Sequence, residues 1–296
     1  MIRQLATWFV YANVLGLAGI AFASGASEEG IPPVEVMTFN IRYNNPRDGE
    51  NAWPHRKDMV ADIIRERADI ACLQEARLEQ IRDLEQRLPD FEWYGVGRDD
   101  GKQGGEFCPI FYRRDRYDVL DQKTFWLSET PDVAGSKSWD AAITRLVTIV
   151  QFSDTRTDTP FWVLNTHFDH VGVEARENSA RLIRESFGRL ARRQPVIAAG
   201  DFNCTPKTEP YAIMTAPEPG PKMIDSRAIT QQPPTGPNST WCGFREVIPG
   251  RRIDFIFVSP GIEVHRHCTI DEKTNGRFPS DHLPVVVDLS LASAKE

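Results

Sequence analysis

The chain has 296 residues, of which 41% are hydrophobic and 26% are charged, and its formal net charge is −7. This composition is typical of a globular protein, and the length suffices for one large hydrophobic core, so we expect one domain over residues 34–292. An acidic chain lacks the positive field with which proteins usually hold long nucleic acids, which excludes a tight binder of duplexes.

The first 23 residues are organised like a secretory signal peptide. Arg3 supplies a positive charge, Leu5 to Ala21 is almost entirely apolar, and Ala21-Phe22-Ala23 fits the small-x-small cleavage rule. We expect cleavage after Ala23, a secreted or periplasmic protein, a linker over residues 24–33, and a monomer without a stable membrane anchor. The alternative is an uncleaved anchor, because the apolar stretch nears the ~20 residues that span a bilayer. Loss of Arg3 would change the net charge from −7 to −8.

Five cysteines lie in the expected mature chain, without CxxC spacing: Cys72, Cys108, Cys204, Cys242 and Cys268. An odd number cannot pair completely, so at most two disulfides can form, and the sequence leaves their pairing open. Cys72 lies in the apolar run Ile70 to Leu73, which is typical of a buried strand and predicts an inert core thiol.

The first part of the domain alternates strands with helices. A strand is predicted over Val34–Phe39, ending at Asn40, and a helix over Trp53–Arg67, where Met59, Ile63 and Ile64 have helical spacing. A strand over Ile70–Leu73 then leads to Glu75, and a second helix covers about Leu78–Leu88.

The middle of the chain is predicted to be a hairpin region interrupted by one long loop, Ser128–Ala142. Its expected strands are Glu92–Val96, Phe107–Tyr112, Tyr117–Leu127, Arg145–Phe152 and Phe161–Phe168. A helix over Val173–Arg193 and four strands complete the chain: Pro195–Gly200, Ile253–Val258, Ile262–Ile270 and Leu283–Leu289. Helices and strands mix without a repeat, which indicates two packed sheets with helices outside.

Polar residues recur just after the apolar runs, where a sheet delivers side chains into a shared cleft. They are Asn40, Glu75, His167, Asp201, Asn203, Asp254, Asp281 and His282. Carboxylate and amide oxygens suit a hard cation such as Mg²⁺, with Glu75 the obvious anionic ligand, and a zinc motif of the HExxH kind is absent. The ordered set therefore predicts metal-assisted hydrolysis of a phosphate ester.

Each of these residues alone has an ordinary structural explanation. Asn40 could be a turn residue, Glu75 a solvated carboxylate, and Asp201-x-Asn203 a turn or helix cap. His282 could be a satisfied interior histidine, and Asp254 could simply pair with a neighbouring arginine. These explanations weaken because all of them would have to hold at once.

Six segments share the order and character of motifs in one known superfamily. They are Thr38-Phe39-Asn40, Leu73-Gln74-Glu75, Asn165-Thr166-His167, Gly200-Asp201-Phe202-Asn203, Arg252-Ile253-Asp254 and Ser280-Asp281-His282. Together they resemble the endonuclease/exonuclease/phosphatase superfamily over nearly the whole mature chain. The resemblance implies an α+β fold of the DNase I type, a four-layer α/β/β/α sandwich of two packed mixed sheets flanked by helices.

The resemblance also implies a role for each matched residue. His282 would be the catalytic histidine and Asp254 the carboxylate that fixes its imidazole. Asp201 would position the attacking water with help from Asn203, and His167 would stabilise the transition state. Glu75, Asn40 and Asp281 would hold Mg²⁺, with Mn²⁺ as a substitute. Whether His282 or Asp201 is the general base stays open.

One segment departs from the abasic-site endonucleases of this superfamily. Those proteins continue the first motif as Asn-x-Asp, whereas here Asn40-Ile41-Arg42 offers an arginine. The chain is instead similar to a secreted bacterial branch near the deadenylases of the carbon catabolite repressor and nocturnin type.

Four further residues are weaker candidates for substrate contact. Asp169 either touches substrate or supports His167. Arg56, Arg98 and Lys137 either bind phosphate oxygens or are simply solvated.

The expected function is a secreted, Mg²⁺-dependent phosphoesterase that cleaves a phosphodiester or phosphomonoester by in-line attack of water. An acidic surface favours a small molecule or single-stranded nucleic acid as substrate. The alternatives are a 3′-5′ exonuclease, a phospholipid or sphingomyelin phosphodiesterase that inserts Trp126 and Trp139 into the bilayer, and an inactive binding module on the same fold.

Overall fold

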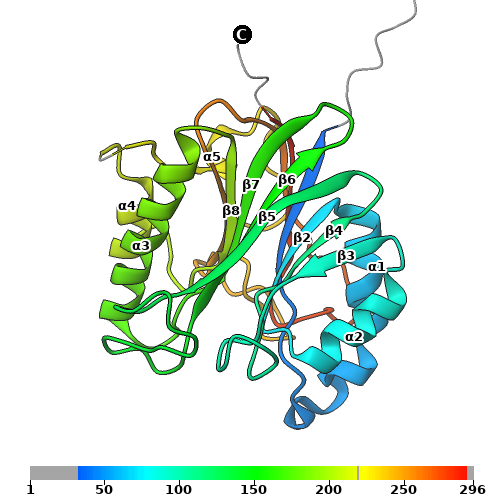
Figure 1. Cartoon of the computed structure of the whole chain (residues 1–296). Helices are drawn as coiled ribbons and strands as arrows, with labels where there is room; N and C mark the ends of the chain where they lie inside the picture. The colour runs from blue at the N-terminus through cyan, green and yellow to red at the C-terminus, as the bar shows by residue number, and fades with distance from the viewer. Residues whose placement is uncertain (1–32, 219, 292–296) are drawn as a thin grey trace, which may run out of the picture. The chain divides into compact units, whose positions relative to one another are not determined.

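The first sheet contains six strands in the order β11-β12-β1-β2-β4-β3. Its strands β2, β4 and β3 lie side by side in Figure 1. Their bounds in the computed structural model are Val34–Asn40 (β1), Ile70–Gln74 (β2), Phe91–Tyr94 (β3), Ile110–Arg113 (β4), Glu263–Thr269 (β11) and Val285–Ser290 (β12). Strands β1 and β2 run parallel, whereas the other neighbours are antiparallel. The sheet therefore joins the two ends of the domain, because β12 pairs with β1.

The second sheet also contains six strands, in the order β5-β6-β7-β8-β10-β9. Their bounds are Tyr117–Trp126 (β5), Leu146–Asp154 (β6), Thr159–His167 (β7), Val196–Asp201 (β8), Ile224–Asp225 (β9) and Asp254–Val258 (β10). Only β7 and β8 run parallel in this sheet, so both sheets are mixed.

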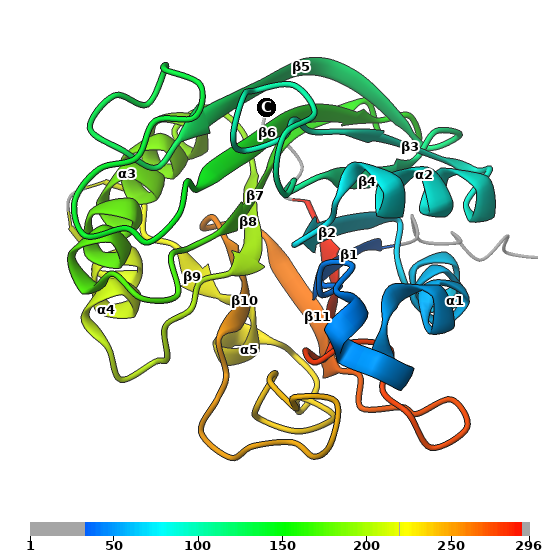
Figure 2. The same cartoon turned by 90° about the horizontal axis from the view of Figure 1, so that it is seen from below.

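Apolar side chains hold the layers together. Val36, Cys72, Val163 and Ile256 belong to a core between the sheets, where β-branched residues suit flat sheet faces. A second cluster joins the first sheet to α1 (Lys57–Arg67) and α2 (Leu78–Arg87), and a third joins the second sheet to α3 (Val173–Ala191) and α4 (Glu209–Thr215). Figure 2 shows the two helix pairs on opposite sides of the strands. The four-layer α/β/β/α sandwich is confirmed.

The structure describes residues 33–218 and 220–291, and these residues belong to one compact unit. The signal peptide expected over residues 1–23 and nearly all of the linker lie outside the described residues. Within those residues, none of the helices has the length and apolar character that a bilayer crossing requires.

The predicted elements agree with the structure except in three places. The helix expected from Trp53 begins at Lys57, after the short 3₁₀ segments Pro46–Asn51 and Trp53–His55. The middle region is not one run of hairpins, because the chain leaves the first sheet after β4 and enters the second at β5. Sequence analysis missed α4, α5 (Ser226–Ile229) and β9 because they are too short for a periodic pattern.

All five cysteines are free thiols. Burial raises the pKa of Cys72 far above its usual range, and burial also raises the pKa of Cys108, Cys204 and Cys242 to about 12. These four thiols are therefore protonated at neutral pH and poor nucleophiles. The sequence allows at most two disulfides, and the structure forms none between these five cysteines.

Candidate active site

The strand register brings the predicted polar residues to one edge of the two sheets. Asn40 lies opposite Gln74 at the ends of β1 and β2, and His167 lies opposite Asp201 at the ends of β7 and β8. Asp254 pairs with Asp201 although it begins a strand, because β10 runs antiparallel to β8. The expectation that every such residue follows an apolar strand is therefore wrong for two of them, because Asp254 begins β10 and His282 precedes β12.

Polar contacts between the sheets fix this edge. The Gln74 side chain donates to Asn165 Oδ1 at 2.7 Å, and the Asn165 amide donates to the carbonyls of Leu73 and Pro109 at 2.8 Å each. Ser280 Oγ donates to the Asn40 carbonyl at 2.7 Å and so ties the loop that carries His282 to β1. Buried hydrogen bonds of this kind specify one relative position of the two sheets.

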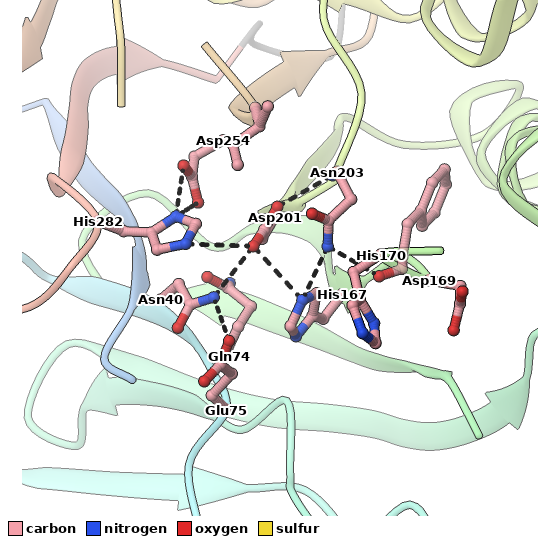
Figure 3. A network of polar contacts seen from close by, with 12 residues as sticks. Asn40, Gln74, Glu75, His167, Asp169, His170, Asp201, Asn203, Asp254 and His282 are labelled. Atoms are coloured by element: carbon pink, nitrogen blue, oxygen red, sulfur yellow. Dashed lines mark hydrogen bonds and ion pairs between the residues drawn. The ribbon is translucent and has the colours of Figure 1, made fainter. Parts of the chain in front are cut away.

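His282 and Asp254 form a buried pair (Figure 3). The distances from His282 Nδ1 to Asp254 Oδ2 and Oδ1 are 3.0 and 3.3 Å. Burial alone would lower the pKa of His282, but the negative charges of Asp254 and Asp201 raise it well above its ordinary value. The carboxylate therefore orients the ring and stabilises the imidazolium, and Nε2 is directed toward Asp201, 3.8 Å from its Oδ2.

Asp201 is the centre of the network. Its Oδ2 accepts from Asn40 Nδ2 at 3.0 Å and lies 3.4 Å from His167 Nε2, while its Oδ1 accepts from the Asn203 backbone at 3.0 Å. Burial, and next the charge of Asp254, raise the pKa of Asp201 to about 7. A carboxyl group with such a pKa can exchange protons near neutral pH.

Asn203 and His167 form the neighbouring part of the network. Asn203 Nδ2 donates to the Phe168 carbonyl at 3.1 Å and lies 3.0 Å from His167 Nε2. Burial, followed by the charges of Arg145 and Arg98, holds the pKa of His167 well below its ordinary value, so this imidazole is neutral.

Glu75 and Asp281 occupy the other side of Asn40. Glu75 accepts from Asn40 Nδ2 at 3.0 Å and from the Tyr43 backbone at 3.1 Å. Arg42 lies 4.0 Å from Glu75 and 3.9 Å from Asp281, and it donates to Asp48 at 3.0 Å. Arg42, Glu75 and also Asn203 have positive φ angles of 54, 60 and 44°, a left-handed conformation that is rare outside glycine and concentrates at functional sites.

These residues fit a divalent cation. Ligand atoms of Asp201, Asp254 and His282 lie within 4.8 Å of one another and could hold a metal ion. This set differs from the sequence-predicted ligands Glu75, Asn40 and Asp281. We favour the latter, because both oxygens of Asp254 already lie within hydrogen-bond distance of His282. Either set is rich in the hard oxygen donors that such a cation prefers. Burial raises the pKa of Asp281 and of Asp201, and the charge of a bound cation would lower both pKa values again.

A cavity of about 490 Å³ opens onto the network. Its lining residues are Arg42, Tyr43, Glu75, Arg77, Glu106, Ile143, Arg145, His167, His170, Asp201, Asn203, Trp241, Asp281 and His282. A smaller cavity of about 10 Å³ shares the lining residues Glu75, His167 and Arg145 with it. The larger volume is of the size that binds small organic molecules.

The four weaker candidates lie elsewhere or have other partners. Asp169 accepts four backbone N–H groups and so shapes the loops around it, although it lies in the same region (Figure 3). Arg56 is buried and donates to the carbonyls of residues 41, 42, 51 and 279. Arg98 pairs with Glu106 at 2.5 Å, and exposed Lys137 donates to the Ala142 carbonyl at 3.3 Å.

Sequence analysis missed several lining residues, above all Arg145, Tyr43 and Trp241. Arg145 precedes β6 after a long loop, and nothing in its neighbourhood distinguishes it from other arginines that begin strands. In the sequence, Arg42 is distinguished only by its place in Asn40-Ile41-Arg42, where the abasic-site endonucleases have Asn-x-Asp. His170 also lines the cavity, and its position three residues after His167 is a sequence signal for that role.

Comparisons with known proteins agree with this geometry. A model of the Endonuclease/Exonuclease/phosphatase family matches residues 37–282. A crystal structure of an endonuclease/exonuclease/phosphatase from Bacteroides vulgatus is 41% identical, covers 87% of this chain and 98% of its own, and has a TM-score of 0.83. The mannosyl-6-phosphatase Bt3783 of Bacteroides thetaiotaomicron is 34% identical, with coverage of 87% and 99% and a TM-score of 0.79.

Curated relatives are more distant and mostly longer. Carbon catabolite repressor protein 4 homolog 5 of Arabidopsis thaliana is 26% identical over 210 residues, which are 66% of this chain and 44% of that protein. The chain thus spans less than half the length of this relative. The family match, in contrast, covers most of the chain and all the residues of the network. The chain belongs to the Endonuclease/Exonuclease/phosphatase family.

Proposed function

We propose that the protein is an exported, Mg²⁺-dependent phosphoesterase that hydrolyses a small phosphate ester by in-line attack of water. One observation carries the proposal: side chains from both sheets converge on Asp201, which contacts Asn40, His167 and His282 within 3.8 Å at the floor of one cavity. A purely structural cluster has no need of a cavity. Asp201 and His282 both border it, so a substrate can reach them.

Asp201 takes up a proton from the attacking water, and the imidazolium of His282 beside it helps to orient that water. The water oxygen bonds to phosphorus as the ester P–O bond breaks, and the leaving alkoxide takes a proton from bulk water. Asp254 holds the imidazole of His282 in one orientation throughout. Asn203 and neutral His167 supply hydrogen bonds to the phosphoryl oxygens without adding positive charge.

Glu75, Asn40 and Asp281 would hold the cation, which when bound neutralises the charge that develops on the phosphoryl group. Asn40 places its amide between Glu75 and Asp201, so that one residue aligns the cation site with the water site. Arg42 keeps the carboxylates of Glu75 and Asp281 in place from outside the cluster.

The size of the cavity and the charge of the chain support a compact substrate. A cavity of about 490 Å³ suits a sugar phosphate or a single nucleotide better than a polymer, and a net charge of −7 disfavours polyanions. Activity on a phosphorylated sugar in the Bacteroides thetaiotaomicron relative, as its name states, points the same way.

Cleavage of membrane lipids has less support. Trp126, one of the two candidates for insertion into a bilayer, is only 5% exposed and donates to the Arg98 carbonyl at 2.7 Å. Its ring packs with Cys108 and Leu146 rather than projecting from the surface.

A substrate panel tests the proposal. Purified protein would be assayed with and without Mg²⁺ on p-nitrophenyl phosphate, mannose 6-phosphate, bis-p-nitrophenyl phosphate, oligoadenylate and sphingomyelin. We expect Mg²⁺-dependent turnover of at least one small ester and none after His282→Ala. Wild-type protein that is folded, binds Mg²⁺ and cleaves none of them would refute the proposal.

Export is tested separately by expression of the full chain in a bacterial host. We expect the protein in the periplasm or medium, with an amino terminus at residue 24 on sequencing. Retention of the intact amino terminus in the membrane fraction would favour the uncleaved anchor instead.

A further inference from the structure

One buried, positively charged side chain lines the cavity and has no role in the proposed function. Arg145, just before β6, lines both the main cavity and the small one beside it. Its side chain is 4% exposed, and its Nε and Nη1 have no hydrogen-bond partner in the part of the chain that the structure describes. Buried guanidinium donors are normally satisfied, so these two are available to a ligand.

The nearby carboxylates are committed to other donors. Asp169 lies 3.7 Å from Arg145 Nε, but its two oxygens accept four backbone N–H groups, at 2.7 to 3.2 Å. A carboxylate offers about four lone-pair positions, so none is left for Arg145. Glu106 is held by both terminal nitrogens of Arg98, at 2.5 and 3.1 Å.

One neighbour positions the guanidinium without occupying its free edge. His170 Nδ1 lies 3.2 Å from Arg145 Nη2, the nitrogen that does have a partner. Glu75 and His167 line the same two cavities as Arg145, which places the free donors beside the proposed cation and phosphate sites. Arg145 therefore borders the space that the phosphoryl group would fill.

We propose that Arg145 binds a phosphoryl oxygen and makes the site selective for phosphomonoesters over phosphodiesters. A guanidinium presents a planar pair of N–H donors that suits phosphate oxygens. A monoester has three terminal oxygens and up to two negative charges, whereas a diester has two such oxygens and one charge. With one oxygen toward the cation and one toward Asn203 and His167, only a monoester keeps a third for Arg145.

Binding of small anions tests the proposal without turnover. Wild-type protein and Arg145→Gln would be titrated calorimetrically with inorganic phosphate and with dimethyl phosphate, in the presence of Mg²⁺. We expect wild type to bind inorganic phosphate more tightly, and Arg145→Gln to lose at least about 10-fold in that affinity while dimethyl phosphate changes little. Equal weakening of both anions, or of neither, would overturn the proposal.

Kinetics supply a second readout. In Arg145→Gln, kcat/KM should fall at least about 10-fold more for p-nitrophenyl phosphate than for bis-p-nitrophenyl phosphate, and Arg145→Lys should restore part of the preference. Arg266→Lys is the control. Arg266 lies on β11, and its guanidinium already has a partner in Asp288 at 2.7 Å, so it is not available to substrate. A parallel loss of both activities in a folded Arg145→Gln protein would instead assign Arg145 a structural role.

The inference rests on the proposed phosphoesterase function, but the two can fail separately. Protein that binds inorganic phosphate through Arg145 and hydrolyses none of the esters retains this inference and loses the proposed function. Protein that hydrolyses esters with the same preference in Arg145→Gln as in wild type retains the function and loses the inference.

Discussion

Both ends of the strands bury charged side chains, but only one of the two groups is electrically balanced. At the end opposite the cavity, Arg116 donates to Asp69 and, at 3.0 Å, to Asp154, and Arg113 lies 3.4 Å from Asp69. The backbone N–H of Glu35 donates to Asp69 at 3.1 Å, and the backbone N–H of Arg156 donates to Asp154 at 3.0 Å. Two arginines thus face two aspartates, and each charge has a partner.

At the cavity end, carboxylates lie close together, and Asp201 and Asp254 share the single imidazolium of His282. The four carboxylates of this end are Glu75, Asp201, Asp254 and Asp281. Burial raises the pKa of Asp201 and Asp281, and two donors of Arg145 have no hydrogen-bond partner among the described residues. A balanced cluster holds elements together, whereas an unbalanced one is destabilising until a ligand completes it. The difference separates the structural end of the molecule from the functional end.

The largest expected effect is on activity at the unbalanced end. Asp201→Asn and His282→Ala should each lower kcat/KM by about 10³-fold or more, equivalent to about 4 kcal/mol. Metal-free Asp201→Asn should melt no lower than wild type, because it removes a crowded buried charge. Steady-state rates and thermal unfolding measure both effects, with exposed Asp118→Asn as control. Large losses of stability without loss of turnover would reverse the assignment of the two ends.

The opposite end should show the opposite pattern. Arg116→Met leaves Asp154 buried without its cation and Asp69 with Arg113 alone, which should lower the free energy of unfolding by about 3–5 kcal/mol. Below its melting temperature the variant should keep wild-type kcat, because the site lies at the other end of the strands. Denaturant unfolding and rates at low temperature measure this, with exposed Arg114→Met as control. Unchanged stability would show that the paired cluster is not structural.

The sequence predicts the two ends unequally well. Asn40, Glu75, His167, Asp201 and His282 adjoin apolar runs, so local pattern alone indicates that they meet at a sheet edge. Arg116 contacts Asp69 and Asp154 across 47 and 38 residues, and only strand register brings them together. The ion pairs at the structural end therefore have no local signal.

Arg145 and the positive φ angles are hidden for the same reason. Within the described residues, Arg145 is distinguished by two buried donors without a hydrogen-bond partner, and the partners of a side chain follow from tertiary packing. The left-handed conformations of Arg42, Glu75 and Asn203 oppose local preference and are maintained by the surrounding fold. Sequence analysis thus recovers the identities in the network but not its strain or its charge imbalance.

A histidine outside both ends allows pH effects on stability to be separated from those on activity. His267 on β11 is buried and lies 3.1 Å from Ser226 Oγ, and burial lowers its pKa from 6.5 to about 4. The unfolded chain therefore takes up this proton at higher pH than the folded protein does. The contribution to stability is fully present above pH 6.5 and decreases toward pH 4, by about 3 kcal/mol in total.

Denaturant unfolding between pH 7 and 4 measures this slope. His267→Gln should flatten the slope relative to wild type, and His55→Gln, at an exposed position, controls for the loss of a histidine. Activity of His267→Gln at neutral pH should match that of wild type. An identical slope in His267→Gln and wild type would contradict the burial of a neutral imidazole at this position.

The smallest expected effect is the stabilisation of the protein by Mg²⁺, which identifies the residues that hold the ion at the cavity end. Mg²⁺ at about 100 times its dissociation constant should stabilise the protein by about 2–3 kcal/mol, because it binds the folded chain alone. Glu75→Gln should abolish this shift if Glu75, Asn40 and Asp281 hold the ion. Asp254→Asn should abolish it if the ligands are Asp201, Asp254 and His282. Arg116→Met should retain the full shift at a lower melting temperature, because Arg116 lies at the opposite end of the strands from the proposed cation site. Thermal unfolding with and without Mg²⁺ or Mn²⁺ separates these outcomes, and a shift absent from wild type would remove the cation from the proposed mechanism.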